Sequence, residues 1–433
     1  MSAVVAKNDL VLKGSGWQAW LVYGLLFLFP VAGVSVNHWF SGIYALLALT
    51  GLVALFNGTA RQTLFKEERI WLWLCVAFFV SFLVSALVNG WDRPQNSALG
   101  VTVRYLFVVP LLLLLRQYPK AGLALLGGVL VAVFEVAGHA YYDIYQLGKA
   151  RAEGLYSPNF LGPVVALMVM YLLAGWRELR RVRWLLPVAI LLGVWALVMS
   201  GSRGGYVGLV AMLLLWALLT FHGRLRVLML AVAVALPLAG YFMVDEVTQR
   251  VDVAVTEVTT YLVKGVPEGV HGAESSAIRF EMWRAAWMTF LDHPLLGVGD
   301  GNYNKGVQPY IDQGLVDLGV GGHGHPHNAY MNVLMCRGTV GYLVMMAMLF
   351  YPLYYFARSY RDSPSTAMLG MVHTIGFAIF SITDASTFDK NNFTSIYLLC
   401  MALFLSWHAA RVNQRRLYQD GVPGRLSATE TAG

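Results

Sequence analysis

Long apolar runs separated by short polar loops dominate the chain. Twelve segments approach or exceed the roughly 18 to 20 apolar residues that a helix needs to cross a bilayer. They are residues 17–36, 39–56, 70–88, 97–115, 121–142, 159–176, 184–200, 203–221, 226–243, 327–357, 365–383 and 392–410. The pattern predicts an all-α polytopic membrane protein with about 12 transmembrane helices. The tenth run is too long for one simple crossing, so its first turns should lie near the membrane interface or inside the protein.

The polar segment between the ninth and tenth runs also carries helical patterns. Residues 278–292 place Ile278, Met282, Ala285 and Ala286 on one side of an amphipathic helix. His293 and Pro294 should end that helix, and the glycines of residues 297–301 predict a turn-rich exit. A second helix is expected within residues 247–264. About eighty residues between two spans indicate a functional lid or a small domain.

Composition narrows the class of protein. Of the 433 residues, 58% are hydrophobic and only 13% are charged. A soluble domain cannot cover its surface with so little charge, which excludes a globular enzyme with a single anchor. The net charge of +7 does not imply a nucleic-acid partner, because basic residues collect in the cytoplasmic loops of membrane proteins. Membrane lipids are the expected surroundings, and no nucleic acid is expected to bind.

Lysine and arginine also predict the orientation. Nineteen of them flank the spans on one side, whereas the short loops on the other side hold five. Those five are Arg93, Lys149, Arg151, Arg203 and Lys390. The basic side should be cytoplasmic, with both termini inside. The prediction is helices one to nine in residues 1–243, a large periplasmic loop in 244–326, helices ten to twelve in 327–412 and a cytoplasmic tail in 413–433. In a bacterium with two membranes, this describes an inner-membrane protein.

Three histidines at alternate positions stand out in residues 321–330. His323, His325 and His327 follow a glycine-rich lead-in, and Pro326 is suited to the first position of a helix. His327 should then lie in the first turn of that helix. The partial positive charge of a helix start keeps an imidazole neutral. A neutral imidazole near pH 7 can accept a proton. The alternative is a polar loop that meets the membrane surface.

Two arginines are expected on the same side as His327. Arg203 opens the eighth span and Arg279 opens the outer helix. Guanidinium groups bind phosphate oxygens in a bidentate fashion and stay charged. Two of them beside a neutral histidine suit a diphosphate leaving group next to a site of proton abstraction. The plainer readings are an interfacial side chain for Arg203 and a solvated helix-end charge for Arg279.

Other ionisable groups have two interpretations each. Glu135 and His139 are one helical turn apart within a span, which favours a structural ion pair that could include Arg104 over a proton path. Asp384 and Asp389 in the last outer loop could orient His327 or be ordinary loop carboxylates.

Metal and nucleotide sites have weak sequence support. The alternating histidines lack an accompanying cysteine or carboxylate cluster, so no metal ion is expected. Cys75, Cys336 and Cys400 all fall in or beside apolar segments and should be packing residues. A phosphate-binding loop of the strand-to-helix kind does not occur, so no cofactor is expected.

These motifs resemble the O-antigen ligase family of bacterial inner membranes. The family signature is histidine, then asparagine, serine or glutamine, nine residues, and Gly-x-x-Gly. Here it is His327 and Asn328, residues 329–337, then Gly338 and Gly341. The arginine at the start of a span and the outer-loop block that begins at Arg279 are similar too. The topology agrees, so the resemblance covers most of the chain.

The resemblance implies a GT-C-type membrane glycosyltransferase without metal or nucleotide. The donor would be undecaprenyl diphosphate carrying O-antigen, and the acceptor a sugar hydroxyl of the lipid A–core oligosaccharide. His327 would be the catalytic base, and Arg203 and Arg279 would bind the donor diphosphate, with His325, Asn328, Gly338, Gly341 and Asp384 as further site candidates. An O-antigen polymerase and a protein O-oligosaccharyltransferase use the same chemistry. A transporter or flippase of lipid-linked sugar is the alternative outside enzymes.

Overall fold

The computed structural model of the chain describes residues 16–56, 64–243, 245–265, 276–384 and 386–419. Within these ranges the regular structure is helical and contains no β-strand. The first half comprises α1 (Trp17–Ser35), α2 (Trp39–Phe56), α3 (Lys66–Val88), α4 (Arg93–Thr102), α5 (Arg104–Leu115), α6 (Ala121–Tyr141), α7 (Pro158–Ala174), α8 (Leu186–Ser200) and α9 (Arg203–Thr220). The second half comprises α10 (Gly223–Met243), α11 (Asp245–Lys264), α12 (Ser276–Asp292), α13 (Tyr303–Asp312), α14 (Ala329–Arg358), α15 (Pro364–Thr383), α16 (Ser386–Asp389) and α17 (Asn391–Gln419).

Ten helical segments among the described residues are long and apolar enough to cross a membrane. They confirm an all-α polytopic membrane protein. Of the twelve runs that the sequence predicts, ten correspond to these segments. The other two runs correspond to α7, which is apolar but shorter, and to α10. Several side chains of α10 are not among those that the structure describes.

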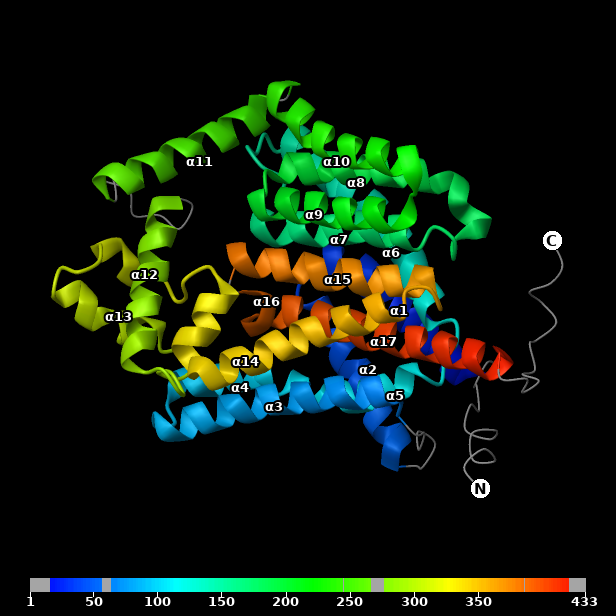
Figure 1. Cartoon of the computed structure of the whole chain (residues 1–433), viewed down its shortest axis with the longest axis horizontal. Coiled ribbons are helices and arrows are strands. Elements are labelled where there is room, and N and C mark those ends of the chain that lie inside the picture. Colours follow the sequence, from blue (N-terminus) through cyan, green and yellow to red (C-terminus); the bar gives the residue numbers. More distant parts are fainter. Residues whose placement is uncertain (1–15, 57–63, 244, 266–275, 385, 420–433) are drawn as a thin grey trace.

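The spans pack side by side in one bundle (Figure 1). Helices α15 and α17 occupy its interior, and almost every residue of α17 from Phe393 to Ala409 is buried. Helix α17 contacts α2, α5 and α15, and α15 contacts α7, α9 and α14. The buried cysteines Cys75, Cys336 and Cys400 are free thiols within this packing, as the sequence predicts.

The segment between α10 and α14 forms its own small group of helices at one end of the bundle (Figure 1). Helix α12 buries the face that the sequence predicts, and Ile278, Met282, Ala285 and Ala286 are fully enclosed. They form a cluster with residues of α13 and with Met335 of α14. Helix α11 confirms the predicted second outer helix. The sequence analysis missed α13 and a 3₁₀ turn over Leu318–Gly322.

Helix α14 confirms that the tenth apolar run is not one simple crossing. Its helical geometry is interrupted at Gly338, where φ is 62° and ψ is −164°. The interruption leaves two carbonyl groups free to bind another segment. The amides of Val298 and Gly299 donate to the carbonyls of Met335 and Cys336 over 3.0 and 2.9 Å. The helices between α10 and α14, which we call the outer helices, are therefore joined to the bundle at this break.

A buried ion pair reinforces the same junction. Arg337 is 3% exposed, and its Nε lies 2.9 and 3.0 Å from the two carboxylate oxygens of Asp300. Its guanidinium lies over the ring of Phe78, 4.2 Å from the centroid, and donates to the Phe78 carbonyl. Arg337 thus connects α14, the exit from the outer helices and α3.

Glu135 and His139 meet on one face of α6, as their spacing predicts. Both contact the hydroxyl of Ser35 on α1, and the His139 Nε2 lies 3.1 Å from it. Arg104 instead donates to the carbonyl of Gly100 one turn earlier. The contacts of Glu135 and His139 join two neighbouring helices.

Candidate functional site

A cavity of about 200 Å³ lies where the outer helices meet the bundle. Its walls come from four parts of the chain that are far apart in sequence. Its charged lining residues are Arg151, Arg203, Arg279 and Asp384. Ligand pockets for drug-sized molecules are usually larger, about 300–1,000 Å³, so this cavity suits a compact charged group. Both arginines that the sequence singles out line it.

Arg203 enters the cavity from the start of α9. Ser202 caps this helix, because its hydroxyl accepts from the amide of Gly205 over 3.3 Å. The Arg203 guanidinium donates to the hydroxyl of Ser276 over 3.0 Å and lies 3.9 Å from the Glu257 carboxylate on α11. A single carboxylate at that distance leaves the guanidinium able to bind a stronger anion.

Arg279 approaches from the first turns of α12. Its Nη1 donates to the carbonyl of Thr383 at the end of α15 over 3.1 Å. That bond fixes the guanidinium beside Asp384, the next residue along. The same bond joins the outer helices to the innermost part of the bundle.

The loop before α14 differs from the prediction for His327. The helix begins at Ala329, and Asn328 is its N-cap, because the Asn328 side chain accepts from the amide of Met331 over 3.1 Å. Pro326 is therefore not the first helical residue. His327 lies outside the helix, with a φ of 49°, so the helix start does not explain its protonation state.

Burial and neighbouring positive charge keep His327 neutral instead. Burial is the largest cause of the decrease in its pKa to about 3, followed by repulsion from the protonated form of His325 and from the charge of Arg279. The carboxylate of Asp384 acts in the opposite direction. Burial also lowers the pKa of His325. Both rings are therefore uncharged near pH 7 and can accept a proton.

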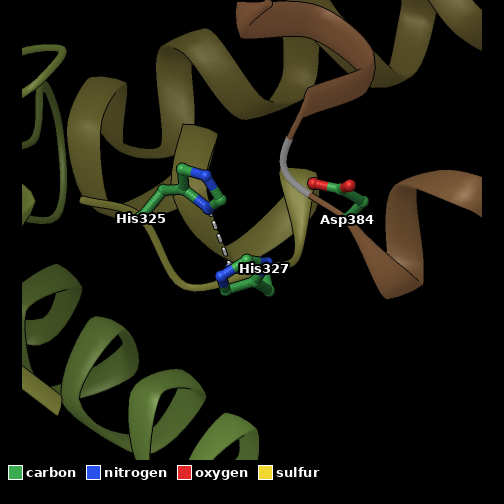
Figure 2. A group of neighbouring side chains, drawn as sticks. All are labelled: His325, His327 and Asp384. Carbon is green, nitrogen blue, oxygen red and sulfur yellow. Dashed lines mark hydrogen bonds between the residues drawn. The ribbon is translucent and has the colours of Figure 1, made fainter. Parts of the chain in front are cut away.

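Figure 2 shows His325 and His327 on this loop, with Asp384 on the neighbouring segment. The closest ligand atoms of the three side chains lie within 4.8 Å of one another. The backbone amide of His327 donates to the Nδ1 of His325 over 3.3 Å. Asp384 also lines the cavity, so it connects the histidine pair to the two arginines. The other candidate carboxylate, Asp389, has a side chain that lies outside the described residues.

Comparison with known families matches residues 188–346 to the family described as O-Antigen ligase. Over these residues the chain is similar to that family. The match spans Arg203, Arg279 and His327, which come together in the structure, and so supports the resemblance drawn from their motifs.

Two relatives extend the likeness beyond residues 188–346. An O-antigen ligase of Pseudomonas aeruginosa is 26% identical over 366 residues, which is 80% of this chain and 81% of that protein. An uncharacterized protein of Haemophilus influenzae is 22% identical over 375 residues, 83% of this chain and 91% of its own length. The similarity therefore includes most of the membrane-spanning helices.

The glycines of the domain's signature have a structural explanation. Gly338 adopts a backbone conformation that is essentially restricted to glycine, and a Cβ there would lie 2.3 Å from the backbone of Leu295. At Gly341 a Cβ would lie 2.3 Å from the Cβ of Arg337. The Gly-x-x-Gly part of the signature therefore shapes the junction. His327 lies next to Asp384, which lines the cavity, and Asn328 caps α14.

Arg151 is a site residue that the sequence does not predict. It lines the cavity, and its guanidinium donates to the carbonyl of Ser200 over 2.9 Å and to the side chain of Asn159 over 3.2 Å. These bonds hold the turn that precedes Arg203. A usable signal was present, because Arg151 is one of only five basic residues in the short loops on the predicted outer side.

Proposed function

We propose that this protein transfers O-antigen polysaccharide from undecaprenyl diphosphate to a sugar hydroxyl of lipid A–core. The reaction takes place on the periplasmic side of the bacterial inner membrane, in a GT-C-type enzyme. Arg203 and Arg279 bind the donor diphosphate, and His327 is the general base. One observation carries the proposal. Both guanidinium groups line one cavity, and the neutral ring of His327 lies next to Asp384, which lines the same cavity.

The chemistry follows from this arrangement. The acceptor oxygen attacks the anomeric carbon from the face opposite the diphosphate, which inverts that carbon. The carbon–oxygen bond to phosphate breaks, and the electron pair leaves with undecaprenyl diphosphate. His327 takes the proton of the attacking hydroxyl. Arg203 and Arg279 stabilise the charge that develops on the leaving group, so the step needs no metal ion.

The donor diphosphate replaces the contacts that Arg203 makes with Ser276 and Glu257. Glu257 lies 3.9 Å from the Arg203 guanidinium and also accepts from the amide of Ser276 over 2.8 Å. A diphosphate offers more charge and more acceptor oxygens than one carboxylate. Donor binding therefore moves Glu257 of α11 away from Arg203.

The test uses purified protein, lipid-linked polymer and lipid A–core, with a chelator present and nucleotide omitted. The wild type should join polymer to lipid A–core, and His327→Ala should lose at least about 100-fold in rate, the lower range for a general base. The matched control is His222→Ala, because His222 is exposed and precedes α10. Near-normal transfer by folded His327→Ala would refute the base assignment. Extension of the lipid-linked polymer instead of lipid A–core would indicate a polymerase.

Arg279→Lys tests the phosphate-binding role separately. Lysine keeps the positive charge but cannot form two parallel bonds to phosphate. We expect a large rise in the KM for the donor with little change in the KM for lipid A–core. Unchanged donor kinetics would remove Arg279 from the binding site.

A further inference from the structure

We propose that His325, His327 and Asp384 form a binding site for a transition-metal cation such as Zn²⁺, and that the bound cation inhibits transfer. The inhibition rests on the proposed role of His327, whereas the binding does not. The transfer reaction itself needs no metal. The cation competes with the proton of the acceptor for the same nitrogen.

The donor set fits this class of cation. Imidazole nitrogen and carboxylate oxygen are common Zn²⁺ ligands, at about 2.0–2.2 Å from the metal. The three ligand atoms already lie within 4.8 Å of one another, and side-chain rotation can bring them to the separation of about 3.4 Å that a tetrahedral site requires. The sequence alone predicts no metal ion, because no carboxylate or cysteine cluster accompanies the histidines. The fold supplies it as Asp384, from the end of α15 (Figure 2).

A fourth ligand is available nearby. The Nε2 of His323 is buried and has no hydrogen-bond partner among the described residues. Its ring centroid lies 5.9 Å from that of His327, and the rings of His325 and His327 are 4.4 Å apart. His323 lies outside the group whose ligand atoms are within 4.8 Å of one another, so its ring has to move for three imidazoles and one carboxylate to complete the four-coordinate set that Zn²⁺ adopts in proteins. A cation here would give the orphaned nitrogen a partner.

The electrostatics select among cations. The site offers two imidazole nitrogens and one carboxylate oxygen to a metal. The positive charges of Arg279 and Lys390 act on the same pocket and oppose a cation that binds by charge alone. Zn²⁺ and Cu²⁺ bind imidazole strongly, whereas Mg²⁺ and Ca²⁺ prefer oxygen ligands. The site should therefore take the former pair and exclude the latter.

Binding is measured on protein purified in detergent without a polyhistidine tag. After dialysis against low Zn²⁺ and metal analysis, we expect about one ion per chain for the wild type. His325→Ala and Asp384→Asn should each weaken binding at least about tenfold, and His222→Ala should bind as the wild type does. Melting temperatures without metal show whether the variants are folded. Equal binding by all four proteins, or none by the wild type, would overturn the site.

Inhibition is measured in the transfer assay, with each protein compared with its own metal-free rate. The Zn²⁺ concentration that fills the site should slow the wild type at least about tenfold, and EDTA should restore the rate. Mg²⁺ at the same concentration should have no effect. Zn²⁺ that fills the site without slowing transfer would refute the inhibition. Failure of His327 as the base would instead appear as transfer by His327→Ala, which leaves the binding measurement valid.

Discussion

The break in α14 makes a strong prediction for Gly338→Ala. Its φ of 62° and ψ of −164° fall in a region that costs other residues about 1–3 kcal/mol. The added Cβ would lie 2.3 Å from the carbonyl carbon and oxygen of Leu295. Neither atom is the end of a flexible side chain, so the backbone of the outer segment must move.

That movement affects the hydrogen bonds at the junction. The amides of Val298 and Gly299 donate to α14 just before the break, and the amide of Thr339 donates to the carbonyl of Pro294 over 2.8 Å. Each such bond contributes about 0.5–1.5 kcal/mol net. Loss of all three, added to the backbone strain, gives a destabilisation of about 3–7 kcal/mol.

The assay is thermal unfolding in detergent, followed by tryptophan fluorescence. We expect Gly338→Ala to lower the melting temperature by at least about 5 °C and to lose transfer, because the first helical piece of α14 follows His327 and Asn328 directly. The matched control is Gly42→Ala in α2, where a Cβ would meet no atom within 4 Å and alanine favours the helix. If both variants melt within about 1 °C of the wild type, the account of the junction is refuted.

Two further predictions concern charged groups. Asp300→Asn leaves Arg337 buried without its carboxylate and should cost about 3 kcal/mol or more, whereas Glu178→Gln should cost less than about 1 kcal/mol, because its partner Arg411 is 35% exposed; equal unfolding curves for the two variants would contradict this. Because the pKa of His327 is lowered to about 3, kcat/KM for the donor should stay level from about pH 8 to pH 5, where a histidine of ordinary pKa would give a fall of about 30-fold. The same decrease in pKa favours the neutral ring in the folded protein. The contribution of His327 to folding stability is therefore full above about pH 6.5 and declines as the pH falls towards 3. A fall in kcat/KM near pH 6.5 that His327→Gln abolishes would refute the lowered pKa of His327.

The sequence predicts the spans well because their signal is local. The length of an apolar run can be read directly from the sequence. The periodicity of an amphipathic face, such as that of Ile278 and Met282, can be read from the same short stretch. The error at His327 was also local. Proline and asparagine both favour the start of a helix, at different positions. The prediction started the helix at Pro326, whereas the chain starts it one residue after Asn328.

The cavity could not be assembled from the sequence because its walls depend on packing. Asp384 reaches His325 and His327 only because α14 packs against α15. Arg151 reaches the turn before Arg203 through bonds to Ser200 and Gly201, which span some fifty positions. Signatures identify a few of these residues, but their separation in the sequence gives no distance in space.

Arg279 connects the two halves of the proposed reaction. Its charge helps to lower the pKa of His327, which keeps the ring neutral but makes it a weak base. When a diphosphate binds Arg279, its negative charge offsets that effect, and the pKa of His327 rises towards the value at which it accepts a proton efficiently. The base is therefore strengthened when the donor is present. The pH dependence of kcat reflects the enzyme with donor bound. As the pH is lowered, kcat should therefore begin to fall at a higher pH than kcat/KM does.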